Sequence, residues 1–207
     1  MSTFYERHIL PHVIGCACGL PPVSALRSKI VPHAAGKVLE LGIGGGLNLA
    51  FYDATRVNSV TGVDPSEGLR AKAAAAPRSA GLRVEILDGV GEALPFEDAS
   101  FDTAVCTFTL CSVESPEATL LEARRVLKPG GRLLFSEHGL SPDTGVRRWQ
   151  HRLEPLWKPF AGGCHLTRSA TALIAAAGFV LDDHEGKYMR GVPRLLGWSE
   201  CGTALRD

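Results

Sequence analysis

The feature that most constrains this chain is the glycine-rich run GIGGG at 42–46, which directly follows the apolar run KVLEL at 37–41. Short aliphatic runs that end at glycine are typical of buried strands. Glycines after such a strand let the backbone turn sharply and approach a ligand closely. Residues 48–52 are expected to continue into a helix, whose N-terminus would attract a negatively charged group. This order of strand, glycine loop and helix predicts a ligand site at the edge of a sheet.

Two glycine patterns compete for this loop. The dinucleotide-binding pattern G-x-G-x-x-G, counted from Gly42, requires a third glycine where Leu47 stands, so it fails. An acidic residue followed by x-G-x-G-x-G is matched in full by Glu40, Gly42, Gly44 and Gly46.

A second strand, expected at 59–63, ends at Asp64. A carboxylate at this place can accept hydrogen bonds from both hydroxyls of a bound ribose. The same spacing occurs in nicotinamide-dependent enzymes, so it indicates nucleoside binding without indicating the reaction. The alternative is a glycine-rich turn beside a surface aspartate that binds nothing.

The rest of the chain alternates short β-type runs with helical stretches. Further strands are expected at 83–87, 103–109, 132–136, 179–187 and 199–205, and helices at 67–76, 116–127 and 168–177. This alternation is typical of a parallel sheet flanked by helices. Residues 142–160 are expected to form an irregular, partly helical insertion, and residues 4–18 a weak helix interrupted by Pro11.

Composition narrows the class of protein. A chain of 207 residues with 45% apolar and 21% charged residues is expected to fold as one domain. Lys+Arg and Asp+Glu both total 22, which argues against a nucleic-acid partner. The six cysteines follow no apolar secretory signal, and no apolar run reaches the length of a membrane span. We therefore expect a cytoplasmic monomer or homodimer with reduced thiols and no transmembrane segment.

Most of residues 37–135 resemble the class I S-adenosylmethionine-dependent methyltransferases. The matching motifs are VLELGIGGGLNLAFY at 38–52, GVDP at 62–65, GEALPF at 91–96, SFD at 100–102 and VLKPGG at 126–131, the last three being similar to the ubiquinone/menaquinone methyltransferase-like branch. The resemblance implies an α/β fold, with a Rossmann-like, doubly wound, mostly parallel seven-stranded sheet, an antiparallel last strand and helices on both faces. It also implies one domain over 1–207, with an N-terminal helical lid over 1–32 and a substrate-side insertion over 138–167.

A narrower resemblance is to the methyltransferase-like seven proteins, which are alkyl-thiol S-methyltransferases. It rests on VCT at 105–107, LCSV at 110–113, EH at 137–138, WQ at 149–150, Leu153, Pro155, Trp157, GC at 163–164 and LTR at 166–168. This resemblance implies S-methylation of a small thiol or sulfide.

The broader resemblance also implies roles on the cofactor side. The residues expected to bind S-adenosylmethionine, which becomes S-adenosylhomocysteine, are Glu40, Gly42, Gly44, Gly46, Asn48, Asp64, Pro65, Gly91, Glu92 and Thr107. Many relatives place an aspartate where Val90 stands, to accept a hydrogen bond from the adenine amino group. Because valine cannot accept one, Asp88 or a backbone carbonyl is expected to do so.

On the acceptor side, methyl transfer requires a nucleophile aligned with the activated methyl group, and no metal is expected. A thiol needs only partial ionisation, since its reference pKa is about 8.5 and a nearby cation lowers it. His138 follows the fifth strand, at the edge where doubly wound sheets bind ligands, and is expected to act as an acid, a base or an orienting residue. Glu137 and His165 are the other catalytic candidates. The expected pocket residues are Cys111, Trp149, Trp157, Cys164 and Arg168.

Other interpretations of these residues and of the function remain open. The histidines, cysteines and tryptophans can be ordinary core residues. The pairs Cys164-His165 and Cys16-x-Cys18 are compatible with a metal or redox site, but four regularly spaced ligands are absent, so a structural role is favoured. The alternative functions are C-, O- or N-methylation of a quinone, phospholipid head group or other small lipophile, and cofactor binding without catalysis.

Overall fold

The computed structural model describes residues 18–207, in which seven strands form one sheet in the order β3-β2-β1-β4-β5-β7-β6. The parallel strands are β1 (Gly36–Leu41), β2 (Val57–Asp64), β3 (Val84–Asp88), β4 (Phe101–Thr107) and β5 (Leu127–His138). β7 (Trp198–Leu205) runs antiparallel to both β5 and β6 (Val180–Tyr188). The predicted seven-stranded, mostly parallel sheet with an antiparallel last strand is confirmed.

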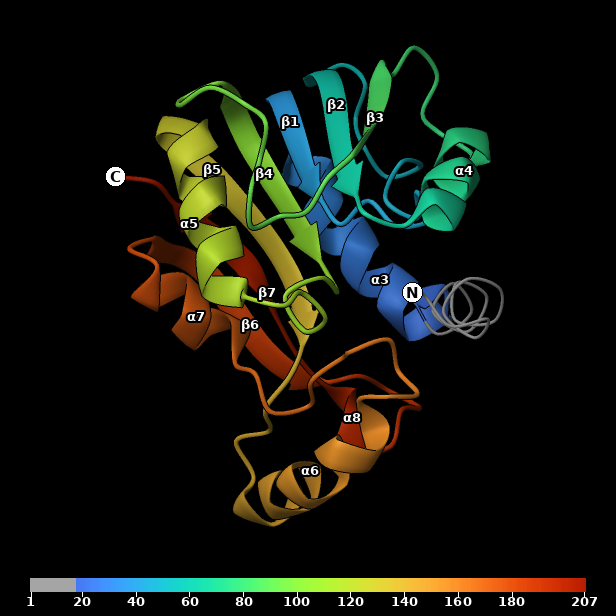
Figure 1. The fold of residues 1–207 in the computed structure, drawn as a ribbon, viewed down its shortest axis with the longest axis vertical. Coiled ribbons are helices and arrows are strands. Elements are labelled where there is room, and N and C mark those ends of the chain that lie inside the picture. Colours follow the sequence, from blue (N-terminus) through green and yellow to red (C-terminus); the bar gives the residue numbers. More distant parts are fainter. Residues whose placement is uncertain (1–17) are drawn as a thin grey trace.

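Helices cover both faces of this sheet (Figure 1). On one face, α3 (Pro21–Ile30), the short η1 (Val31–His33) and α4 (Glu67–Ala75) pack against the core formed with β1, β2 and β4. On the other face, α5 (Pro116–Val126) and α7 (Ala170–Ala176) pack against a second core. α6 (Thr144–Trp157) and α8 (Arg194–Gly197) contact each other beyond the carboxyl ends of the parallel strands (Figure 1).

Serine caps explain where three of these helices begin. The hydroxyl oxygens of Ser66, Ser115 and Ser169 accept hydrogen bonds from the third backbone N–H that follows, at 3.4, 3.2 and 3.4 Å, and so begin α4, α5 and α7. Pro116 at the first position of α5 is favourable because its ring presets the helical φ angle. Gly178, with a φ of 85°, follows α7 and ends it in the left-handed conformation.

Two expectations are corrected, and one lies outside the described residues. Residues 48–52 form turns instead of a helix, because Asn48 and Tyr52 direct their side chains into a buried polar network. Residues 142–160 are more regular than expected, since α6 continues for 14 residues with Pro155 inside it. The weak helix expected at 4–18 lies outside the described residues, except for its last position.

No helix within residues 18–207 combines the length and the apolar character that crossing a membrane requires.

The parallel strands bring the chemistry-bearing residues to one edge. Leu41, Asp64, Thr107 and His138 are the last residues of β1, β2, β4 and β5. Because neighbouring parallel strands end at the same edge of a sheet, these residues and the loops after them form one rim, where doubly wound folds bind ligands.

Candidate active site

The glycine loop after β1 is shaped by left-handed backbone. Gly42, Gly44 and Gly46 have φ angles of 63°, 55° and 76°, which residues with a Cβ rarely adopt. A Cβ at Gly42 would lie 2.6 Å from the Thr109 side chain. At Gly44, by contrast, the nearest atom beyond its chain neighbours is the Gly42 carbonyl oxygen at 3.8 Å, so bare backbone faces open space. Such a surface lets a ligand approach the main chain closely.

A buried polar network lies beside this loop. The Asn48 amide donates to Glu40 Oε1 at 2.9 Å and to Thr107 Oγ1 at 3.0 Å. The Tyr52 hydroxyl donates to Glu40 Oε2 at 2.7 Å. From α3, Arg27 Nη1 donates to Asn48 Oδ1 at 2.8 Å and to Thr107 Oγ1 at 2.5 Å. The network thus joins the N-terminal helix to the ends of β1 and β4.

Burial disfavours the charged forms of the ionisable groups in this network. Burial raises the pKa of the Glu40 carboxyl to about 7, although hydrogen bonds from Tyr52 and Asn48 and the charge of Arg27 oppose the shift. Burial also lowers the pKa of Arg27, which is 6% exposed. Within the described residues, Arg27 Nε has no hydrogen-bond partner. A buried guanidinium with a free N–H is suited to a carboxylate ligand. Arg27 and Tyr52 were not foreseen from the sequence.

Asp64 is anchored next to the glycine loop. The backbone N–H of Gly44 donates to Asp64 Oδ2 and that of Ser66 to Oδ1, both at 2.9 Å. Burial raises the pKa of Asp64 while these two donors lower it. Each carboxylate oxygen can accept a further bond, which is what two ribose hydroxyls require. Pro65 follows on the exposed side.

The residues expected beside the adenine make contacts with other parts of the protein. Gly91 packs against α5, since a Cβ there would lie 2.7 Å from the Thr119 side chain. Glu92 accepts a hydrogen bond from the Ser115 backbone N–H at 3.1 Å. Val90 is exposed, and Asp88 pairs with Arg70 at 2.8 Å. These contacts give Gly91 and Glu92 a structural role in seating α5.

A largely apolar cavity of about 500 Å³ opens at the same rim. Its walls come from residues 18–23, the loop after β4, the end of β5, residues 157–166 and residues 189–196. Among the expected pocket residues, Cys111, Trp157 and Cys164 line this cavity, and so does His138. The structure therefore brings these four together.

Cys111, His138 and Cys164 meet within this cavity. His138 Nε2 lies 2.8 Å from Cys164 Sγ, and the three potential ligand atoms all lie within 4.8 Å of one another. A hydrogen bond from the Cys164 thiol, together with the charge of His138, lowers the pKa of Cys111 well below its ordinary value. The same hydrogen bond and burial raise the pKa of Cys164. Burial disfavours protonation of His138, but the negative charge on Cys111 raises the pKa of the ring overall.

Phe108 connects the cavity to the polar network. Its φ of 54° is left-handed, which costs a non-glycine residue of order 1–3 kcal/mol. Its ring stacks on the His138 ring, with centroids 6.4 Å apart, and the Arg27 guanidinium lies 5.2 Å from its centroid. Strain of this kind is concentrated at functional sites. No sequence pattern indicated Phe108.

Three predicted residues lie outside the lining of the cavity. His165 Nδ1 lies 2.9 Å from Glu154 Oε1. Arg168 Nη1 donates to the carbonyls of Leu110 and Val113 at 2.6 and 2.9 Å. Trp149 is 56% exposed. Because none of the three lines the cavity, the structure does not place His165, Arg168 or Trp149 in the acceptor site.

Glu137 is buried beside the cluster without lining the cavity. It is 1% exposed, and its Oε1 accepts a hydrogen bond from the Thr109 backbone N–H at 2.8 Å. Burial raises the pKa of Glu137 to about 8, so the carboxyl is largely neutral at pH 7. Its contact with Thr109 positions the loop that carries Phe108 and Cys111.

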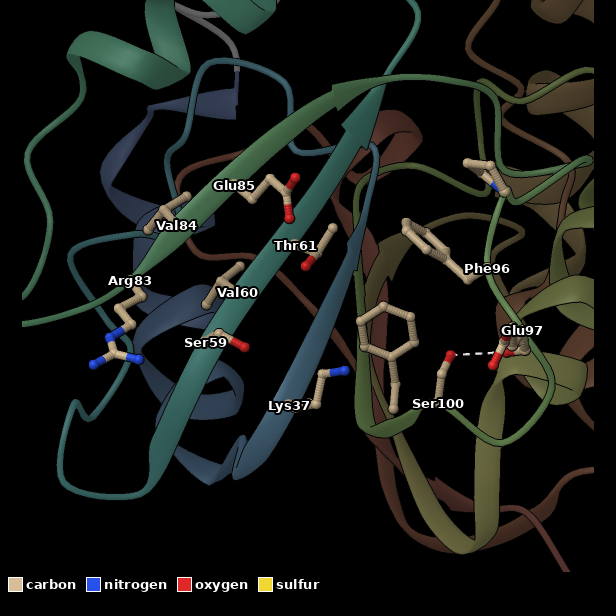
Figure 2. A pocket seen from close by; sticks show the side chains of 12 residues that line it. Lys37, Ser59, Val60, Thr61, Arg83, Val84, Glu85, Phe96, Glu97 and Ser100 are labelled. Atoms are coloured by element: carbon tan, nitrogen blue, oxygen red, sulfur yellow. Dashed lines mark hydrogen bonds between the residues drawn. The ribbon is translucent and has the colours of Figure 1, made fainter.

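A second cavity, of about 530 Å³, lies on the sheet away from this rim. Figure 2 shows Ser59, Thr61 and Glu85 on β2 and β3, with Phe96 on the loop before β4. Among residues 18–207, no residue of the glycine loop and no histidine or cysteine lines it. It offers no group for the expected chemistry.

Comparisons with known proteins place the fold among methyltransferases. Residues 39–135 match the family described as methyltransferase domain. A SAM-dependent methyltransferase of Methanosarcina mazei has a TM-score of 0.63 and 27% identity, with 82% of this chain and 92% of that chain covered. A putative methyltransferase of Bacillus halodurans has a TM-score of 0.69 and 20% identity, with 88% of this chain and 98% of that chain covered. At this low identity, the likeness supports the fold alone. Residues 39–135 thus match a methyltransferase domain, and the fold is shared with S-adenosylmethionine-dependent methyltransferases.

Curated relatives include proteins named for different acceptors. Thiol S-methyltransferase TMT1B of Rattus norvegicus is 43% identical over 148 residues, which are 69% of this chain and 59% of the relative. Thiol S-methyltransferase TMT1A of Homo sapiens is 34% identical over 160 residues, covering 75% and 65%. Demethylmenaquinone methyltransferase of Clavibacter sepedonicus is 38% identical over 125 residues, covering 60% and 50%. The chain thus spans about six-tenths of the length of the thiol S-methyltransferases that it matches.

Proposed function

We propose that this protein methylates the sulfur of a small thiol or of sulfide. The observation that carries the proposal is the position of Cys111, His138 and Cys164 in an apolar cavity at the rim that also holds the glycine loop. Apolar walls suit an alkyl group. A positive charge at this cluster would lower the pKa of an acceptor thiol beside it, since an opposite charge favours the ionised form.

The residues around the glycine loop fit the cofactor. Gly44 offers bare backbone, Asp64 offers a carboxylate for the ribose hydroxyls, and Arg27 brings a guanidinium beside the glycine loop for the methionine carboxylate. Glu40 supplies a negative charge for the methionine ammonium. When bound, S-adenosylmethionine supplies a sulfonium methyl group that a nucleophile accepts directly.

The protein's main task is then to orient the acceptor and exclude water. Phe108, between Thr107 of the polar network and the acceptor cavity, holds its ring against His138. Leu20 and Val23 line the cavity from the N-terminal side, and Arg27 reaches the polar network from the same segment. These contacts support the proposed role of residues 1–32 as a lid.

The curated names of the relatives favour a thiol over other acceptors, because the thiol S-methyltransferases are matched over a larger share of this chain than the demethylmenaquinone methyltransferase. The second candidate is methylation of a quinone or a phospholipid head group, and the apolar cavity is compatible with a lipophile. A third is cofactor binding without turnover.

The test is formation of S-adenosylhomocysteine with acceptors that differ in one atom: ethanethiol, ethanol and ethylamine, with sulfide, a demethylated quinol and phosphatidylethanolamine vesicles in parallel. We expect turnover of ethanethiol and sulfide alone. Asp64→Ala serves as the control that is deficient in cofactor binding. Turnover of the quinol or the lipid without the thiols would establish the second candidate. Tight cofactor binding without turnover of any acceptor would establish the third.

A further inference from the structure

Three potential metal ligands converge from separate parts of the chain. His138 ends β5, Cys111 lies in the loop after β4, and Cys164 lies in the loop after α6. Their ligand atoms fall within 4.8 Å of one another, close enough to share one ion. The sequence predicted no metal, because it contains no four regularly spaced ligands. These three residues are far apart in the sequence and meet only in the folded chain.

The backbone around these ligands is held in place from several sides. His138 pairs with Ser199 in the sheet. The Cys111 carbonyl accepts a hydrogen bond from the His165 backbone N–H at 2.7 Å. Arg168 holds the carbonyls of Leu110 and Val113, on either side of Cys111. A metal site depends on supporting contacts that fix its ligands, and His165 and Arg168 provide such contacts here.

We propose that Cys111, His138 and Cys164 bind one Zn²⁺ ion whose fourth coordination position faces the apolar cavity and takes the acceptor sulfur. Two thiolates and one imidazole form a ligand set that favours zinc over harder cations. Catalytic zinc sites use three protein ligands and leave one position open, and the combination of two cysteines with one histidine is among them. All three residues line the cavity, so the open position is directed to where an acceptor enters.

The role of this ion rests on the thiol acceptor proposed above. On coordination, the acceptor loses its S–H proton to water and binds zinc as a thiolate. A lone pair of that sulfur forms the new bond to the methyl carbon, while the bond from the methyl carbon to the sulfonium breaks and leaves its electron pair on the cofactor sulfur. The product is a neutral thioether, a weaker ligand than a thiolate, and it leaves. No electron is exchanged with the metal, since zinc has no redox chemistry here.

Cys18 provides a matched control. It lines the same cavity but does not belong to the cluster of three. If the site has an open position, Cys18→Ser binds metal as the unmodified chain does. If Cys18 were a fourth protein ligand, its removal would weaken metal binding and overturn the open position.

The experiment uses the full chain, reduced and stripped of metal, and titrates it anaerobically with Co²⁺ as a spectroscopic probe and with Zn²⁺ in competition. We expect one Co²⁺ per chain, with a sulfur-to-cobalt charge-transfer band and the visible bands of a tetrahedral ion. Cys111→Ser, Cys164→Ser and His138→Ala should each weaken metal binding by about 100-fold or more, because losing only a contact that supports a ligand already costs about 10- to 100-fold. Circular dichroism confirms that each variant is folded. Absence of the band in the folded, reduced chain would overturn the proposal, and so would equal binding by the Cys111→Ser/Cys164→Ser double variant.

A second readout separates the metal site from the catalytic proposal. Adding ethanethiol to the Co²⁺ form should change the charge-transfer band, whereas its methyl thioether should leave the band unchanged. This shift requires no methyl transfer, so it can succeed even if thiol turnover fails. Metal binding without any response to ethanethiol would overturn the open position, and thiol turnover by the metal-free protein at an unchanged rate would overturn the catalytic role of the ion.

Discussion

Arg27 on α3 donates a hydrogen bond to Thr107 Oγ1 at 2.5 Å, although the two residues are 80 positions apart. This contact fastens the N-terminal helix to the end of β4, beside the glycine loop. It brings a residue from outside the matched domain at 39–135 to the proposed cofactor site.

Replacing Arg27 by methionine should weaken binding of S-adenosylhomocysteine by about 10- to 150-fold. The reason is the loss of one charge-assisted hydrogen bond to the methionine carboxylate, worth about 1.5–3 kcal/mol. Calorimetric titration measures the affinity, and Lys29→Met, on the same helix but exposed, is the matched control. The nucleoside 5′-methylthioadenosine, which has no carboxylate, should bind equally to the Arg27 variant and the unmodified chain. An equal loss for both ligands would assign Arg27 a purely structural role.

Replacing Asp64 by alanine should weaken the binding of both S-adenosylhomocysteine and 5′-methylthioadenosine, because both ligands contain the ribose. The loss of one or two charge-assisted hydrogen bonds corresponds to at least about a tenfold decrease in affinity. The control is Asp98→Ala, which removes an exposed carboxylate paired with Arg125. If the Asp64 variant retained its affinity for 5′-methylthioadenosine, the ribose assignment would be wrong.

Glu40 should make the stability of the cofactor-free protein fall as pH rises. Its folded pKa of about 7 lies above the ordinary value of 4.5, so the folded state retains a proton that the unfolded state has lost. The resulting contribution to stability is complete below pH 4.5 and is lost as pH rises through about 7. Between pH 5 and 8 the unfolding free energy, relative to that of Glu40→Gln, should fall by about 2–3 kcal/mol. Urea titrations of both proteins at the two pH values measure this difference, and parallel curves would show that Glu40 titrates normally.

Replacing glycine by alanine should have opposite effects on stability inside and outside the glycine loop. Gly42→Ala places a Cβ 2.6 Å from Thr109 at a φ of 63°, and left-handed backbone alone costs alanine about 1–2 kcal/mol. Gly68→Ala, in α4, adds a Cβ that would meet no atom within 4 Å beyond its own helix backbone, and it should instead stabilise the protein by about 0.5–1 kcal/mol. Thermal unfolding of the two variants measures the contrast. A Gly42 variant with an unchanged melting temperature would mean that the loop relaxes without strain.

The sheet and the glycine loop could be predicted because their signals are local. A strand followed by spaced glycines and then by Asp64 at the end of the next strand constrains the backbone directly. The helix expected at 48–52 was wrong because Asn48 and Tyr52 donate hydrogen bonds to the buried Glu40 carboxylate. Helix propensity does not include such tertiary contacts.

The acceptor side was harder to predict because it is assembled through space. Cys111, Trp157 and Cys164 were named by resemblance, His138 also by its place after the fifth strand, and all four line one cavity. His165 was named as a possible base and pairs instead with Glu154. Residue type alone cannot separate a group that faces a cavity from one that supports its wall. Phe108 carried no signal because its left-handed backbone depends on contacts made only in the folded chain.

The cavity walls at 157–166 and 189–196 contribute no residue to the polar network around Glu40. These two wall segments are therefore separate in sequence from the residues that hold Glu40, whereas residues 18–23 and the loop after β4 adjoin both the cavity and the network. Mutations in the two wall segments can alter which molecules enter without disturbing the methyl donor. Natural variation in these segments offers a direct route by which one ancestral scaffold could diversify into enzymes that share a donor and differ in what they modify.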